Sequence, residues 1–166
     1  MPNSLARTLT RTLVAGAAVL LGPWHPAMAA SPGHTVFDAN CSMCHQLGAA
    51  GVPGQFPRLA GRAHRIASTA AGRRYLEHVV LYGMIGPITV DHSPIEGGFM
   101  PSFASLSNQD LAAALSYVIS LDRSGKAHWK APVIRPAQIA RVRAGKTWAP
   151  AEVHRLRASA LGKAKR

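Results

Sequence analysis

Cys41-Ser42-Met43-Cys44-His45 is the most informative segment of this sequence. Two cysteines separated by two residues can add to both vinyl groups of one haem, and a histidine directly after them then lies under the iron. A zinc site would need about two more strong ligands at short spacing, and the chain has 2 cysteines. A thiol–disulfide exchange site would use Cys41 and Cys44 but would leave His45 without a role. The motif therefore predicts one covalently attached haem c, with His45 as a ligand of its iron.

Residues 1–29 have the pattern of a secretory signal peptide. Arg7 and Arg11 precede a short apolar run at 13–21, and 27–29 (Ala-Met-Ala) form a small-x-small cleavage pattern. The apolar run is about half of the ~20 residues that span a bilayer, so we expect cleavage and no transmembrane anchor. A mitochondrial transit peptide shares the acid-free composition, but the compact apolar core favours Sec-type export to the periplasm.

The charge of the chain is unevenly distributed. The net charge is +12, yet residues 30–125 contain six basic and six acidic side chains. Residues 126–166 contain eleven Lys or Arg against Glu152 alone. The division predicts a haem domain at 30–125 and a basic extension at 126–166.

The basic extension has two open interpretations. Pro136–Ala144 and Pro150–Leu161 each begin with the proline that is favoured at the first helical position, which predicts two helices with narrow apolar sides. The extension is then either a solvated, partly disordered segment or a docking arm for an acidic partner or an anionic membrane surface. Nucleic acid is not an expected partner, because the aromatic residues of this extension are limited to Trp129 and Trp148.

The haem domain is predicted to be all-α, with three to four helices around the haem. Gly- and Pro-rich sequence at 48–61 and 86–101 predicts an ordered loop and a long strap, and no alternating strand pattern is present. The first predicted helix starts at Pro32, with Val36 and Phe37 facing inward, and a second spans Arg73–Tyr82. Another follows a Ser107–Asp110 capping box and has apolar residues at helical spacing: Leu111, Leu115, Val118 and Ile119.

Met100 is the first candidate for a second ligand of the iron. Pro101 forces the residue before it into an extended conformation, which holds Met100 in the Gly-rich strap just before a capped helix. Met43 lies between the two cysteines and is expected to point away. Met84 fits a packing role better. His92 is the chief rival of Met100, with Met84 behind it.

Taken in order, the Cys41–His45 motif, Pro57-Arg58-Leu59 and Met100-Pro101 resemble the corresponding parts of a class I cytochrome c. The segments 51–61 (GVPGQFPRLAG) and 98–107 (GFMPSFASLS) resemble small periplasmic bacterial cytochromes and cytochrome subunits of periplasmic dehydrogenases. The resemblance covers roughly residues 31–121. It implies that Cys41 and Cys44 form thioethers to the haem and that His45 and Met100 are the axial ligands. It also implies that the Pro57 carbonyl accepts a hydrogen bond from His45 and that Leu59 packs on the haem.

With both axial positions filled, the chemistry left to the iron is one-electron cycling between Fe(II) and Fe(III). We expect an electron-transfer protein and not an enzyme, carrying electrons from a periplasmic dehydrogenase to an oxidase or another cytochrome with an acidic docking surface. One alternative is a fixed cytochrome subunit of a multi-component oxidoreductase, docked through the basic extension. A less favoured alternative is a haem enzyme or sensor in which Met100 dissociates.

Overall fold

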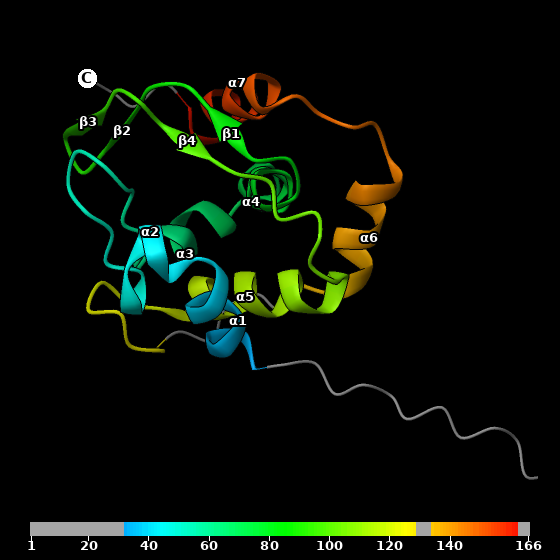
Figure 1. Ribbon diagram of the computed structural model, residues 1–166, viewed down its shortest axis with the longest axis horizontal. Coiled ribbons are helices and arrows are strands. Elements are labelled where there is room, and N and C mark those ends of the chain that lie inside the picture. Colours follow the sequence, from blue (N-terminus) through cyan, green and yellow to red (C-terminus); the bar gives the residue numbers. More distant parts are fainter. Residues whose placement is uncertain (1–31, 129–133, 163–166) are drawn as a thin grey trace, which may run out of the picture.

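The computed structural model describes residues 32–128 and 134–162 (Figure 1). The predicted signal peptide at 1–29 and Trp129 lie outside the described residues. The chain order of elements is α1 (Gly33–Asn40), α2 (Ser42–His45), a 3-10 turn η1 (Leu47–Ala49), α3 (Arg62–Ala67), α4 (Ala70–Tyr82), β1 (Met84–Ile85), β2 (Ile88–Val90), β3 (Ser93–Ile95), β4 (Phe99–Met100), α5 (Asn108–Ser120), α6 (Pro136–Ala144) and α7 (Pro150–Leu161).

Helix α5 begins where the sequence predicts. The Ser107 hydroxyl oxygen accepts a hydrogen bond from the Asp110 backbone N–H at 3.0 Å and donates one to the Asp110 carboxylate at 2.7 Å, which closes the capping box. The predicted apolar face of α5, from Leu111 to Ile119, is buried.

Two helix starts differ from the prediction. Helix α4 begins at Ala70 and not at Arg73, because the Thr69 hydroxyl caps the Gly72 N–H at 2.9 Å. Helix α1 begins at Gly33, so Pro32 is its capping residue and not its first helical residue. A sequence pattern of apolar positions locates a helix better than it locates its first turn.

Helices α1 and α5 cross at very short range. A Cβ atom on Gly33 would collide with the Ala113 carbonyl oxygen, so only glycine fits at this crossing. Four residues further along α1, the rings of Phe37 and Tyr117 pack at 5.7 Å between centroids. The two helices thus place the end of α1, and the Cys41–His45 motif after it, at a fixed position.

Residues 84–100, which overlap the predicted strap, contain strands that the sequence analysis does not predict. β1 pairs antiparallel with β4, which places Met84 opposite Met100, and β2 pairs with β3. Each strand has two or three residues, which is too short for alternating hydrophobicity to be visible. The fold remains mainly helical, as predicted, with two small two-stranded sheets formed by residues 84–100.

The basic extension folds back onto the haem domain. Helices α6 and α7 have the predicted bounds, and they lie against α4 and α5 (Figure 1). Ile139 and Val153 are each 0% exposed, so both helices bury an apolar residue in the main core. A solvated, disordered segment therefore does not describe residues 134–162. None of the helices in 32–128 and 134–162 is long and apolar enough to cross a membrane.

Candidate functional site

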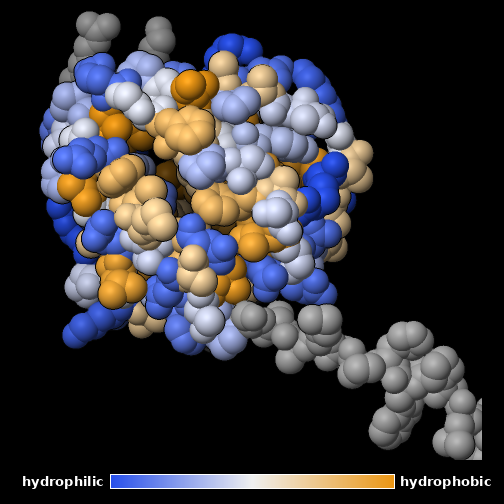
Figure 2. All heavy atoms as spheres, in the orientation of Figure 1, coloured by the Kyte–Doolittle hydropathy of each residue, from blue (hydrophilic) through white to orange (hydrophobic). Residues whose placement is uncertain are grey.

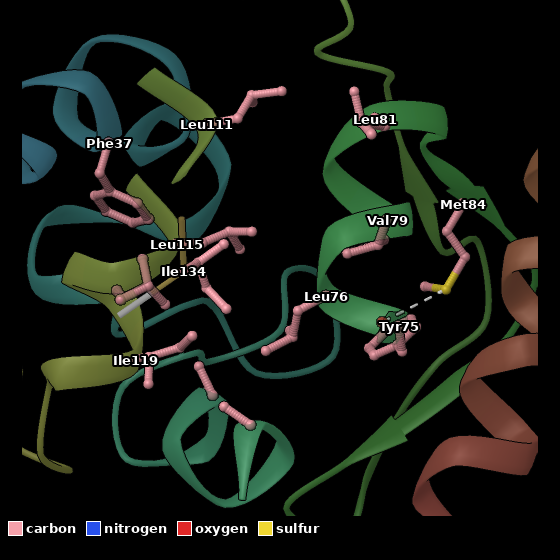
Figure 3. Packing of buried hydrophobic residues seen from close by; sticks show 14 of the residues in the cluster. Phe37, Tyr75, Leu76, Val79, Leu81, Met84, Leu111, Leu115, Ile119 and Ile134 are labelled. Carbon is pink, nitrogen blue, oxygen red and sulfur yellow. Dashed lines mark hydrogen bonds between the residues drawn. The ribbon is translucent and has the colours of Figure 1, made fainter. Parts of the chain in front are cut away.

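An apolar cavity of about 290 Å³ lies inside the bundle. Leu111 and Leu115 of α5 point toward Leu76 and Val79 of α4, and all four line the cavity (Figure 3). The space-filling view shows a hollow between apolar side chains on this face (Figure 2). Protein interiors have few voids larger than a water molecule, so a cavity of this size indicates a bound apolar group.

His45 is fixed in the wall of this cavity by a single backbone acceptor. Its side chain is buried, and its Nδ1 lies 2.9 Å from the Pro57 carbonyl oxygen, which is the hydrogen bond that the resemblance implies. Because Nδ1 donates, Nε2 keeps its lone pair for a metal. Burial lowers the pKa of the His45 imidazole, and the Pro57 hydrogen bond opposes that shift in part. The neutral imidazole, which binds metals, is therefore favoured.

The two cysteine thiols line the same cavity as His45. Burial, with a smaller contribution from the charge on Cys44, raises the pKa of the Cys41 thiol to about 11. Both thiols are free. Met43 between them is 90% exposed. Two free thiols and a neutral imidazole beside an apolar cavity are a donor set that fits a covalently attached haem.

The structure separates the candidate second ligands by their surroundings. Met100 of β4 is half-buried and lines the cavity. Met84 also lines it, but its sulfur accepts a hydrogen bond from the Tyr75 hydroxyl at 3.8 Å (Figure 3). His92 is exposed in the turn between β2 and β3. This arrangement favours Met100. Leu59 is half-buried and lines the cavity as well.

Two basic side chains at the cavity were missed by the sequence analysis. Arg62 of α3 and Arg157 of α7 both line it. Burial lowers the pKa of the Arg62 guanidinium, and the charge of Arg157 adds to this, while Asp91 opposes it. Two positive groups placed close together favour an anionic group between them. They lie on helices far apart in sequence. The charge excess of the extension, which includes Arg157, was the one sequence signal that could have pointed to a basic group at the cavity.

Residues 30–122, more than half of the chain, match the cytochrome c family. The chain belongs to that family. A cytochrome c-552 of Thermus thermophilus is 40% identical to this cytochrome over 110 residues, which are 66% of this chain and 70% of the relative. Another T. thermophilus cytochrome c-552 is 42% identical over 80 residues, 48% of this chain and 60% of the relative. Cytochrome c-554(547) of Halothiobacillus neapolitanus is 33% identical over 95 residues, 55% of this chain and 96% of the relative.

Membership of the cytochrome c family confirms three predictions. The helical fold class is correct, the cofactor is covalent haem c with its iron, and the protein transfers electrons with redox proteins as partners. Cys41 and Cys44 occupy the positions of the haem-attaching cysteines in this cytochrome.

Proposed function

We propose that this cytochrome is an exported one-electron carrier that takes electrons from a periplasmic dehydrogenase and delivers them to an oxidase or another cytochrome. The observation that carries the proposal is the placement of a buried His45, fixed by Pro57, and of Met100 on the same apolar cavity. Haem c supplies reversible Fe(II)/Fe(III) chemistry when it is bound. The signal-peptide pattern at 1–29 supports export.

The chain's own residues divide the work of holding the haem. Cys41 and Cys44 would form the thioethers that attach the haem, and His45 and Met100 would bind its iron. Leu59 and the other apolar side chains of the cavity exclude water, which raises the reduction potential relative to an exposed iron.

Arg62 and Arg157 hold the carboxylate groups of the haem in this proposal. Both are basic, both line the cavity, and a guanidinium pairs a carboxylate through two parallel hydrogen bonds.

The partner docks, in our proposal, beside the Met100 strand. Ile85 and Phe99 are paired across β1 and β4, next to the Met84 and Met100 pair, and they are 51% and 66% exposed. Exposed apolar side chains beside the cavity suit a transient redox contact. The charge excess of residues 126–166 favours a partner with an acidic docking surface and also permits contact with an anionic membrane.

That charge excess also fits a second function, a fixed cytochrome subunit of a multi-component oxidoreductase that is docked through the basic extension. Co-purification with a larger redox protein at physiological salt would favour the subunit over the carrier. The haem enzyme or sensor requires an open iron site, so in that function Met100 would have to dissociate from the iron.

The visible spectrum of the haem-loaded protein tests the ligand assignment. We expect sharp split bands after reduction and, in the oxidised protein, a weak far-red sulfur-to-iron band. Met100→Ala should abolish the far-red band and let the reduced protein bind carbon monoxide, whereas the control Met84→Leu should keep the band. A spectrum unchanged in Met100→Ala would overturn the assignment. Carbon monoxide binding by the wild type as tight as that by Met100→Ala would favour the sensor.

A further inference from the structure

The basic extension is hydrogen-bonded to the C-terminal end of the segment that carries Met100. We call this segment, residues 86–107, the methionine strap. The guanidinium of Arg143 in α6 donates to the Ala104 carbonyl at 2.6 Å, to the Leu106 carbonyl at 2.9 Å and to the Asn108 side-chain oxygen at 2.9 Å. One side chain thus ties three acceptors at the junction between the strap and α5.

The same extension also holds the near end of the methionine strap. The His154 Nε2 of α7 lies 2.7 Å from the Pro87 carbonyl oxygen, and Arg157 donates to the Thr89 carbonyl at 3.3 Å. A Cβ atom on Gly86, whose φ is +134°, would come within 3.0 Å of the His154 ring, so the glycine permits this contact. The strap is therefore bonded to the extension on both sides of Met100.

Behind Met100, the strap is bonded to helix α4. The Ser102 hydroxyl donates to the Leu81 carbonyl at 2.5 Å, and the Phe103 N–H donates to the Val80 carbonyl at 2.9 Å. Pro101 has no N–H to add to this. Just after these two residues in the sequence, the Ala104 and Leu106 carbonyls accept the hydrogen bonds from Arg143.

We propose that Arg143 is a positioning residue for Met100, and that the extension acts as an intramolecular brace that keeps the strap closed against the haem. This inference rests on the proposed function, because it takes Met100 as the iron ligand. Opening of the strap competes with the sulfur–iron bond, and each hydrogen bond from Arg143 stabilises the closed strap. A planar guanidinium can donate to three acceptors in fixed directions, which the single nitrogen of lysine cannot reproduce.

The test uses the full-length, haem-loaded protein and carbon monoxide as a probe of the iron position that Met100 fills. In Arg143→Ala we expect the affinity of the reduced protein for carbon monoxide to rise about tenfold, as for the loss of charge-assisted hydrogen bonds. Arg143→Lys should lie between Arg143→Ala and wild type. The control Arg155→Ala removes the same charge from an exposed position on α7 and should match wild type. Wild-type affinity in Arg143→Ala would overturn the brace.

A second readout separates the brace from the ligand assignment. Amide hydrogen exchange should be faster across residues 99–107 in Arg143→Ala, with residues 33–40 of α1 unchanged. Equal acceleration in both segments would mean general loosening and would overturn the brace. If Met100→Ala leaves the spectrum unchanged, the proposed ligand falls and the brace no longer acts on the iron, but faster exchange confined to 99–107 would still identify Arg143 as its anchor.

Discussion

The two sides of the haem cavity are built in different ways. His45 follows Cys44 directly, and its hydrogen-bond acceptor Pro57 is 12 residues away in sequence. The methionine strap is held from much further along the chain, since Arg143 is 35 to 39 residues from its acceptors. His154 is 67 residues from Pro87. The hydrogen bond that orients His45 thus lies within one short segment, whereas the hydrogen bonds that hold the methionine strap to the extension join residues far apart in the chain.

The largest effect is expected on the histidine side. His45→Ala removes the buried nitrogen that Pro57 orients, while the cysteines that attach the haem remain. We expect complete loss of the low-spin spectrum, because the alanine side chain has no nitrogen that could bind the iron. The control His92→Ala changes an exposed turn residue and should keep the wild-type spectrum. If instead His92→Ala lost the low-spin spectrum, His92 would be the ligand that we assign to Met100.

The next effect is expected in the extension. Ile139 of α6 is fully buried, and deletion of a buried isoleucine side chain to alanine typically costs about 2–5 kcal/mol. We therefore expect Ile139→Ala to lower the free energy of unfolding of the haem-loaded protein by about 2–5 kcal/mol in a denaturant titration. Val142→Ala, at a half-buried position of the same helix, should cost less.

The spectrum of Ile139→Ala shows whether the extension supports the methionine side of the cavity more than the histidine side. If the extension supports mainly the methionine side, the far-red sulfur-to-iron band should weaken while the haem stays attached to the cysteines. A change in unfolding free energy below about 0.5 kcal/mol, typical of a surface substitution, would show that the extension does not support the fold.

The same difference explains what the sequence allowed us to predict. The Cys41–His45 motif, the Ser107 capping box and the two prolines that open α6 and α7 act on neighbouring residues. Their consequences could be read from a short window: α5 begins at the expected residue, and α6 and α7 have the expected bounds.

Features that depend on distant residues were not predictable in this way. Helix α3 (Arg62–Ala67) is short, has Ile66 as its one large apolar side chain, and was assigned to no element. The pairing of β1 with β4 brings together residues about 15 apart through two-residue strands. The approach of Arg62 to Arg157, and the contacts of Arg143 with the strap, follow from tertiary packing that no local pattern encodes.

The smallest predicted effect concerns the joint between α4 and the extension. The buried Glu77 of α4 accepts a hydrogen bond from the Gln138 side chain of α6 at 3.1 Å. Burial raises the pKa of the Glu77 carboxyl above its usual value of 4.5, and the Gln138 hydrogen bond and the charge of Arg141 oppose this in part. The folded state therefore binds this proton more tightly than the unfolded state, and stability is lost as the pH rises through the ordinary and then the raised pKa.

Glu77→Gln keeps the size of the side chain and an oxygen that can accept from Gln138, but it cannot ionise. Relative to wild type, its free energy of unfolding should increase between about pH 4 and pH 7, which denaturant midpoints at the two pH values would measure. A difference that stays flat or falls with pH would contradict the raised pKa. If the far-red band of the wild type also weakens over this range while that of Glu77→Gln does not, ionisation at the joint is transmitted to the methionine side. Attachment of the haem beside His45, whose hydrogen-bond acceptor Pro57 lies only 12 residues away, should show no such dependence.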